Sequence, residues 1–256
     1  MASDATELDD WLALAERAAL AAGRALRRRL PEWTGTTAVT GRDVKVAADL
    51  HAERLILDEL ARRSNLPVLS EETGWTGGES TEMLWLVDPL DGSANYARGI
   101  PASAVSIALL QHGSPRLGVI YDFMRDEIYV GRAGAGARLN DVPIRVSTVD
   151  AVESAVLMTG LPARRAFDAA ALAALAEDMA RWRKVRMIGS AALALAYVAA
   201  GRADCYHEDG VMLWDVAAGC ALVTAAGGAV DLGHGPLDGP RIVTATNGRL
   251  AYVTPS

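Results

Sequence analysis

Cysteine is scarce in this 256-residue chain, which contains only Cys205 and Cys220. The two residues lack the CxxC spacing of metal and redox motifs, and both lie among apolar residues. We therefore expect two buried free thiols in a reducing compartment, and no disulfide.

Long hydrophobic runs and an excess of basic residues are also missing. The uncharged stretch at residues 216–230 is too short to span a membrane, and the acidic start MASDATELDD lacks the basic flank and apolar core of a secretion signal. A formal net charge of −7 disfavours a nucleic-acid surface, which needs clustered lysine and arginine. These absences predict a cytoplasmic protein with no membrane or nucleic-acid partner.

Length and hydrophobic periodicity predict one compact domain, residues 1–256, with an N-terminal α+β half at about 1–148 and a C-terminal α/β half at about 149–256. A capping box at Thr6 and Asp9 is predicted to start the first helix, and Gly113 to Pro115 to form a hairpin turn. The predicted helices span residues 6–30, 49–63, 166–182, 190–200 and 214–226. The predicted strands span residues 66–69, 83–87, 103–111, 116–121, 127–131, 154–158, 185–188 and 203–206.

The segment DPLDGS, residues 88–93, follows an apolar run that predicts a buried strand. Pro89 stiffens the backbone, so Asp88 and Asp91 would leave the strand end together and could reach one cation. Gly92 allows a close backbone approach, and a helix beginning at Ser93 would direct its N–H groups at an anion. The alternative is that both aspartates only accept turn and cap hydrogen bonds.

Five other acidic residues have an ordinary structural interpretation when each is taken alone. Glu71 and Glu72 follow another predicted strand, where an acidic pair is usually just surface. Asp49 and Asp215 stand at predicted helix starts, where aspartate is a common cap, and Glu208 could be an exposed acid at a strand end. Only the combination of these residues predicts a site.

A site built from carboxylate oxygens, without nearby histidine or cysteine ligands, favours Mg²⁺ over zinc. Two such ions about 3.5 to 4 Å apart would orient a water molecule, lower its pKa and neutralise the leaving oxygen during in-line displacement. The acidic motifs therefore predict the hydrolysis of a phosphate monoester.

In order and spacing, these motifs resemble the inositol monophosphatase family. The resemblance rests on SEET at residues 70–73, WLVDPLDGSANYARGIP at 85–101 and LWDVAAGCALVTAAGG at 213–228, and it spans nearly the whole chain. It implies an α/β fold with αβαβα layers, of the inositol monophosphatase and sugar phosphatase type. It also implies Mg²⁺-dependent phosphatase activity, common inhibition by lithium, and usually a homodimer.

Carried over position by position, the resemblance assigns a first metal ion to Glu71, Asp88 and the carbonyl oxygen of Leu90. It assigns a second ion to Asp88, Asp91 and Asp215, and a third, weaker ion to Glu71, with Mn²⁺ as a substitute for Mg²⁺. The site would therefore hold two or three ions.

The resemblance also assigns catalytic and substrate-binding roles. Ser93, in place of the family's usual threonine, would position the nucleophilic water together with Glu71, while Asp49 accepts a hydrogen bond from the Ser93 hydroxyl. The amides of Gly92 and Ser93 would hold the phosphate. The remaining substrate contacts would come from Asp91, Gly189, Ser190, Ala191, Glu208 and Asp215, with Glu208 facing sugar or cyclitol hydroxyls.

Three positions depart from the family pattern. Ala38 stands near a frequent lysine, Ala94 replaces a common threonine, and Met212 stands near a histidine that often contacts inositol. These changes leave the metal ligands intact and leave the substrate open.

An inositol monophosphate is the lead substrate, and the rivals are histidinol phosphate, another sugar or polyol phosphate, and a nucleotide 3′-phosphate. A glycosidase pair at Asp88 and Asp91 would leave the other acids without a role, and the absence of a GxxxxGK[ST] loop disfavours a kinase or NTPase. A non-catalytic magnesium-binding scaffold predicts a broken water-positioning set, whereas Asp49, Glu71 and Ser93 are all present.

Overall fold

The computed structural model describes residues 2–33, 36–40, 43–161 and 168–252. The helices are α1 (Ala2–Trp33), α2 (Ala47–Ala61), α3 (Ser93–Ala97), α4 (Ala169–Arg181), α5 (Ala191–Ala199) and α6 (Leu213–Ala225), with a 3-10 turn η1 (Val152–Ser154). A hairpin of β1 (Thr36–Thr40) and β2 (Asp43–Val46) precedes α2.

An eight-stranded sheet has the order β10-β9-β8-β7-β6-β5-β3-β4. Its neighbouring strands are antiparallel except for the parallel pair of β3 and β5. The strands are β3 (Val68–Ser70), β4 (Gly74–Thr76), β5 (Met83–Asp91), β6 (Ala104–Gln111), β7 (Ser114–Asp122), β8 (Glu127–Arg132), β9 (Gly136–Leu139) and β10 (Val142–Ile144).

A five-stranded sheet has the order β12-β11-β13-β15-β14. In this sheet β11 runs parallel to β12 and β13, while β15 is antiparallel to β13 and β14. The strands are β11 (Val156–Met158), β12 (Lys184–Arg186), β13 (Cys205–Met212), β14 (Ala229–Asp231) and β15 (Pro240–Thr246).

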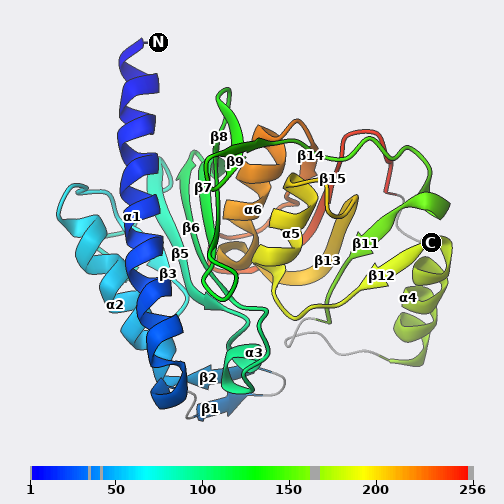
Figure 1. The fold of residues 1–256 in the computed structure, drawn as a ribbon, viewed down its shortest axis with the longest axis horizontal. Coiled ribbons are helices and arrows are strands. Elements are labelled where there is room, and N and C mark those ends of the chain that lie inside the picture. Colours follow the sequence, from blue (N-terminus) through cyan, green and yellow to red (C-terminus); the bar gives the residue numbers. More distant parts are fainter. Residues whose placement is uncertain (1, 34–35, 41–42, 162–167, 253–256) are drawn as a thin grey trace.

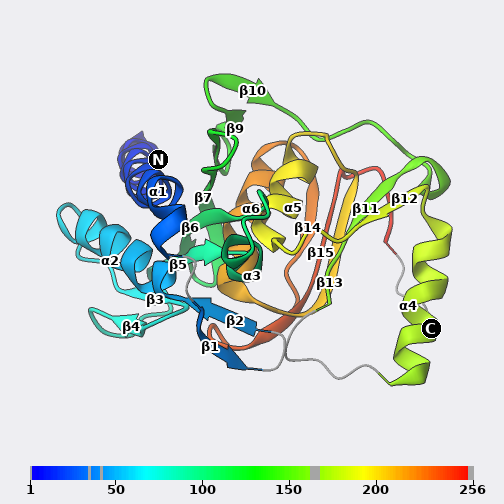
Figure 2. The same cartoon turned by 60° about the horizontal axis from the view of Figure 1, so that its bottom comes forward.

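These elements stack in five layers (Figure 1, Figure 2). Helices α1 and α2 cover one face of the eight-stranded sheet, α5 and α6 lie between the two sheets, and α4 covers the outer side of the five-stranded sheet. The predicted α/β fold with αβαβα layers is confirmed.

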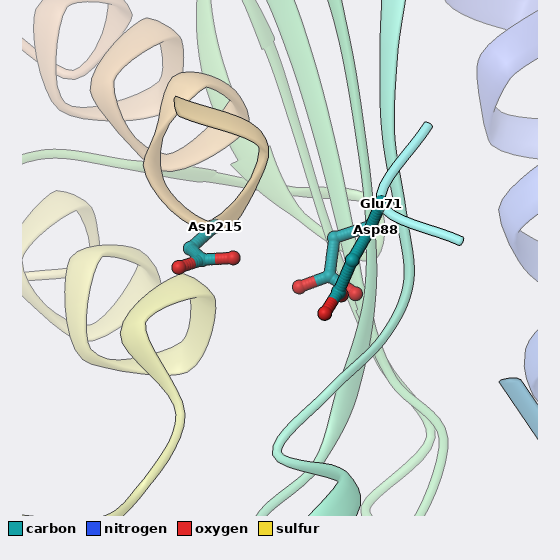
Figure 3. A group of neighbouring side chains, drawn as sticks. All are labelled: Glu71, Asp88 and Asp215. Carbon is teal, nitrogen blue, oxygen red and sulfur yellow. The ribbon is translucent and has the colours of Figure 1, made fainter. Parts of the chain in front are cut away.

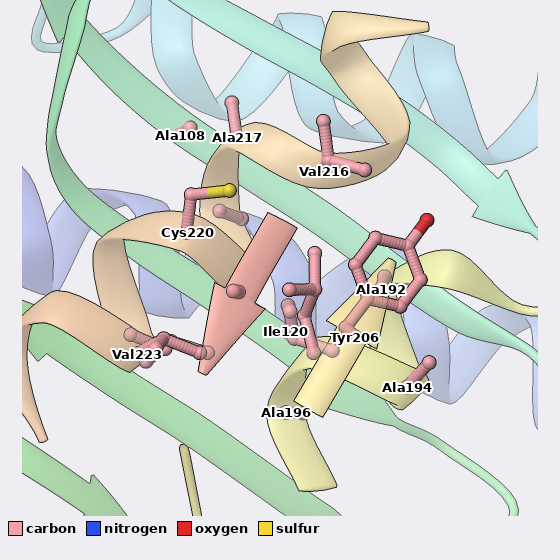
Figure 4. Packing of buried hydrophobic residues seen from close by; sticks show 14 of the residues in the cluster. Ala108, Ile120, Ala192, Ala194, Ala196, Tyr206, Val216, Ala217, Cys220 and Val223 are labelled. Carbon is pink, nitrogen blue, oxygen red and sulfur yellow. The ribbon is translucent and has the colours of Figure 1, made fainter. Parts of the chain in front are cut away.

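The eight-stranded sheet is buried on both faces, which explains the continuous apolar run of β5. Trp85 and Val87 pack in the cluster that includes α1 and α2, whereas Leu84 and Leu86 pack in the cluster that includes α5 and α6. Residues that alternate along a strand point to opposite faces, so both helical layers gain an apolar partner from the same strand. Figure 4 shows the second cluster, between the sheets.

Small residues bring α6 close to β7. A Cβ atom on Gly118 would lie 2.2 Å from the carbonyl oxygen of Ala218, and one on Gly219 would lie 2.3 Å from the Cβ of Leu195. Gly118 therefore lets α6 lie directly against the sheet, and Gly219 lets α5 and α6 pack closely against each other. Among the described residues, none of the helices has both the length and the apolar character that crossing a bilayer requires.

The N-terminal predictions were partly wrong. Helix α1 begins at Ala2, so Thr6 lies inside it and does not cap it, and α1 continues past Pro31 to Trp33, because a proline in the last turn removes only one helical hydrogen bond. The second helix starts at Ala47 and not at Asp49.

The turn between β6 and β7 lies one residue earlier than predicted. Gln111 pairs with Ser114 across a two-residue turn in which His112 has φ 50° and Gly113 has φ 74°. Positive φ at both central residues matches the twist of a hairpin, and Pro115 already belongs to β7.

In the C-terminal half, the alternation of strands and helices agrees with the prediction, but several bounds differ. The helix predicted at 166–182 begins, within the described residues, at Ala169, and its predicted start lies in the undescribed segment 162–167. Strand β13 continues past Tyr206 to Met212; the prediction ended it early because His207, Glu208 and Asp209 are polar, and Glu208 faces the cavity described below. Within the described residues, seven strands were not predicted: β1, β2, β4, β9, β10, β14 and β15.

Candidate active site

A cavity of about 290 Å³ lies where the eight-stranded sheet meets α5, α6 and β13. All of the predicted metal-binding and substrate-binding residues line it: Glu71, Asp88, Leu90, Asp91, Gly92, Ser93, Gly189, Ser190, Ala191, Glu208 and Asp215. The fold thus brings together residues that are up to 144 positions apart (215 minus 71).

Three carboxylates from three segments meet at one point of this cavity. Oxygen atoms of Glu71, Asp88 and Asp215 all lie within 4.8 Å of one another, and Figure 3 shows the side chains converging. Glu71 follows β3 and Asp88 lies near the end of β5, and because these two strands are parallel, their carboxyl ends meet at the same edge of the sheet. Asp215 arrives from the opposite side, in the first turn of α6.

The turn and cap hydrogen bonds, which were the alternative interpretation of the aspartates, are also present. Asp88 Oδ1 accepts a hydrogen bond from the amide of Leu90 at 3.0 Å, and Asp215 Oδ2 accepts one from the amide of Met212 at 3.2 Å. Each bond shapes its own turn or helix start while the carboxylate still lines the cavity. Capping and site formation are therefore compatible uses of the same side chain.

Asp91 is oriented by the start of α5. Its Oδ2 accepts hydrogen bonds from the hydroxyl of Ser190 and, at 2.9 Å, from the amide of Ala192. Ser190 is also the N-cap of α5, since its Oγ accepts a hydrogen bond from the amide of Leu193 at 3.2 Å. Asp91 thereby joins the eight-stranded sheet to the loop that was predicted to line the substrate site.

The carboxyl groups of Asp88, Asp91 and Asp215 have raised pKa values. Burial raises the pKa of Asp88 well above its usual range, and the charges of Glu71 and Asp91 raise it further. Burial likewise raises the pKa of Asp215, again with Glu71 as the next cause. For Asp91, burial raises the pKa to about 7 despite the opposing hydrogen bond from Ser190.

Because like charges held this close in a buried place repel one another, the site favours the binding of either a proton or a cation. The donors are all carboxylate oxygens, a set that suits Mg²⁺ or Mn²⁺. The residues present therefore fit the predicted metal.

Ser93 and Asp49 form a pair beside the acidic cluster. Ser93 Oγ donates a hydrogen bond to Asp49 Oδ1 at 2.9 Å and also lies 3.0 Å from the carbonyl oxygen of Leu90. Asp49 is buried in α2, behind Ser93 and away from the cavity wall. The predicted contact between the two side chains is present.

Gly92 occupies a backbone position that requires glycine. Its φ is 85°, and a Cβ atom there would lie 2.8 Å from the carbonyl oxygen of Ala102. The next turn is tied to the other half of the molecule, because Asn95 Nδ2 donates to the carbonyl oxygens of Ala102 at 2.7 Å and Ile188 at 2.8 Å. This link through Asn95 was not predicted from the sequence.

Glu208 is part of the cavity wall and not an exposed acid at a strand end. It lies within β13, Tyr206 donates a hydrogen bond to its Oε2 at 3.0 Å, and burial raises the pKa of Glu208 to about 7. A Cβ atom on Gly160 would lie 2.5 Å from Glu208 Oε2, so this glycine leaves room for the carboxylate.

Further lining residues were missed by the sequence analysis. They are Thr159, Gly160, Leu161, Ala194, Tyr206, Gly210, Val211 and Trp214. The alternation of Tyr206 and Glu208 along one strand face is a signal that could have identified Tyr206. Of the three departures from the family pattern, Ala94 and Met212 line the cavity, and the side chain of Ala38 lies outside the described part of the chain.

Comparisons with known proteins agree with this geometry. A model of the inositol monophosphatase family matches residues 7–252. An inositol-1-monophosphatase of Mesorhizobium japonicum is 42% identical over 234 residues, which cover 89% of this chain and 88% of the relative. A protein of Xylella fastidiosa named Nus factor SuhB is 40% identical over 218 residues, which cover 84% of this chain and 78% of the relative.

Two solved structures are similar over almost their whole length. The extragenic suppressor protein suhB of Bartonella henselae superposes with a TM-score of 0.85 at 37% identity, covering 94% of this chain and 95% of that one. An inositol monophosphatase of Anabaena superposes with a TM-score of 0.81 at 39% identity, covering 95% of this chain and 92% of that one.

Proposed function

Because this chain belongs to the inositol monophosphatase family and is therefore a phosphatase, we propose that it hydrolyses a small polyol or sugar phosphate, with inositol monophosphate as the lead substrate. The observation that carries the proposal is the convergence of Glu71, Asp88 and Asp215 within 4.8 Å in a cavity. Such a cluster is suited to metal-assisted hydrolysis of a phosphate monoester.

In this proposal Glu71, Asp88, Asp91, Asp215 and the carbonyl oxygen of Leu90 hold two or three Mg²⁺ ions, for which Mn²⁺ can substitute. Mg²⁺, when bound, supplies positive charge that makes water more acidic and neutralises charge on the leaving oxygen. The residues of the chain then have to hold the water and the ester in line.

Ser93 and Glu71 position the nucleophilic water. The Ser93 hydroxyl has one proton, and its 2.9 Å bond to Asp49 directs that proton away from the cavity. The lone pairs of Ser93 Oγ are then available to accept a hydrogen bond from the water, which turns the oxygen of the water toward phosphorus. Glu71 accepts the second hydrogen bond from the water and so fixes its orientation.

The substrate is held at both ends. The backbone amides of Gly92 and Ser93 donate to the phosphate, and the turn of Gly189, Ser190 and Ala191 forms one wall of the site. Glu208 accepts hydrogen bonds from substrate hydroxyls, and Tyr206 holds its carboxylate in place. By resemblance to the family we also infer a cytoplasmic homodimer that lithium inhibits.

The test of substrate class is phosphate release from a panel of inositol monophosphates, histidinol phosphate, fructose 1,6-bisphosphate and adenosine 3′,5′-bisphosphate at saturating Mg²⁺. We expect the highest kcat/KM with an inositol monophosphate. A higher value with histidinol phosphate or a bisphosphate would keep the chemistry and replace the lead substrate. Metal binding without turnover of any ester would instead support the non-catalytic scaffold.

A matched variant checks that the turnover belongs to this cavity. Asp91→Asn keeps the shape of the side chain and its acceptor oxygen toward Ala192 while removing the charge. We expect it to lose most of its activity on every ester in the panel and to remain folded. Normal turnover in this variant would contradict the assignment of Asp91 to the metal site.

A further inference from the structure

Glu53 is a buried acid that the proposed mechanism does not use. It lies in α2, one helical turn after Asp49, and its residue is 2% exposed. Its Oε1 accepts two hydrogen bonds from Thr73, one from the backbone amide at 3.1 Å and one from the hydroxyl at 3.2 Å. A buried carboxylate with this partner links α2 to the turn that carries Glu71.

That turn is short and is held at both ends. Glu71, Glu72 and Thr73 connect β3 to β4, and the pairing of Ser70 with Gly74 closes the turn. The amide of Glu71 donates to the carbonyl oxygen of Val87 in β5 at 3.1 Å, while Thr73 is attached to Glu53. The backbone of Glu71 therefore has one fixed point on each side.

Helix α2 presents two acids with an i, i+4 spacing, and each contacts a different part of the site. Asp49 accepts a hydrogen bond from Ser93, and Glu53 accepts two from Thr73. Like charges at this spacing disfavour a helix by a few tenths of a kcal/mol, so the helix itself gains nothing from the pair. The gain lies in the contacts that the two side chains make beyond the helix.

We propose that Glu53 is a positioning residue that aims Glu71 at Asp88 and Asp215 by fixing the turn through Thr73. The inference rests on the proposed function, because it explains how the side chain of Glu71 is oriented in the proposed metal site. Its requirement is geometric: an acceptor oxygen must reach Thr73 from α2, whether or not that oxygen carries charge.

The proposal is tested with two variants that separate reach from charge. Glu53→Gln keeps the length and an acceptor oxygen, whereas Glu53→Asp keeps the charge and is one methylene too short to reach Thr73. Mn²⁺ binding is measured without substrate by electron paramagnetic resonance, and kcat and KM are measured at saturating Mg²⁺. Loss of a residue that orients a ligand typically costs about 10- to 100-fold in metal affinity or activity.

We therefore expect Glu53→Asp to bind Mn²⁺ about 10-fold or more weakly, with an unchanged substrate KM once Mg²⁺ is saturating. Glu53→Gln should stay within about threefold of the wild type, because a neutral acceptor weakens the two hydrogen bonds without removing them. Asp178→Ala is the matched control: it removes a buried carboxylate of α4 that also accepts side-chain hydrogen bonds, and should leave Mn²⁺ affinity unchanged.

Wild-type Mn²⁺ affinity in a folded Glu53→Asp variant would overturn the proposal and leave Glu53 with a role in stability only. An equal loss in Glu53→Gln and Glu53→Asp would also overturn it, because Glu53→Gln keeps the reach and an acceptor oxygen, so reach would not be sufficient. If the wild type itself bound no Mn²⁺ and released no phosphate with Mg²⁺, the proposed function would fail, whatever the Glu53 variants did.

Discussion

Asp88 in the cavity and Asp178 in α4 are both buried carboxylates, but their surroundings are opposite. Asp178 accepts hydrogen bonds from Trp182 Nε1 at 3.4 Å and from the Tyr252 hydroxyl at 2.8 Å, and it lies 3.4 Å from the guanidinium of Arg181. Asp88 instead faces the carboxylates of Glu71 and Asp215.

This difference separates a structural acid from a binding site. The donors around Asp178 compensate its burial, and the stacking of Tyr252 on Trp182 and on His207 holds them in place. Asp88 has one backbone donor and several negative neighbours, so its burial destabilises the protein until a proton or a cation arrives. An acid that weakens the fold in this way indicates a ligand site.

Asp88→Asn should have the largest effect and should act in opposite directions on activity and stability. The amide keeps the shape and removes a charge from the proposed metal site, so we expect kcat/KM to fall on the order of 10³-fold, equivalent to about 4 kcal/mol. The same change relieves repulsion in the metal-free protein, whose melting temperature should rise. Calorimetry with a chelator present, beside phosphate release with Mg²⁺, checks both parts; a lower melting temperature would contradict the comparison.

Asp178→Ala should show the reverse pattern. Trp182 and Tyr252 each lose a buried acceptor, so the free energy of unfolding should fall by about 2 to 3 kcal/mol. Because Asp178 does not line the cavity, kcat and KM should stay at wild-type values below the melting temperature. Denaturant unfolding and steady-state kinetics on the same preparation measure the two effects, and a change in kcat would mean that α4 is coupled to the site.

Ser190→Ala should have an intermediate effect on both properties. Asp91 loses the hydroxyl donor and keeps the amide of Ala192, so kcat/KM should fall about 10-fold. Helix α5 also loses its N-cap, which costs about 1 kcal/mol of stability. Ser190→Thr retains the hydroxyl and should restore most of both losses; failure of this rescue would argue against the contact with Asp91.

The two cysteines should have the smallest effect on any measurement in the native state. Both are buried, and burial raises the pKa of Cys220 to about 12 and that of Cys205 even further, so both thiols stay protonated well above pH 8. An aromatic disulfide reagent at pH 8 should label neither thiol until the protein unfolds. Rapid labelling of the folded protein would show that burial near β13 and α6 is less complete than the structure indicates.

The candidate site could be predicted from the sequence to the extent that its residues belong to contiguous motifs. Asp88 and Asp91 stand together at the end of one apolar run, and Glu71 follows another. Joining them to Asp215 required the family resemblance, which is confirmed. Spacing alone cannot reveal that the start of α6 approaches the edge of a sheet more than a hundred residues earlier in the chain.

Other parts could not be predicted, for identifiable physical reasons. Three consecutive polar residues, His207, Glu208 and Asp209, interrupt the apolar pattern of β13, so the strand was predicted to end at Tyr206; of these three, only Glu208 lines the cavity. In the sequence, Glu53 is one of several charged residues in α2, and only the fold brings it to Thr73. Strands β9 and β10 have only four and three residues, and their existence depends on the pairing of β9 with β8 and of β10 with β9.

The most direct test of the account is phosphate release from inositol 1-phosphate by chelator-treated protein, before and after Mg²⁺ is restored. We predict no measurable release without the metal, full activity after it is restored, and no recovery in Asp88→Asn. Equal phosphate release with and without Mg²⁺ would contradict the claim that the acidic cluster works as a metal site.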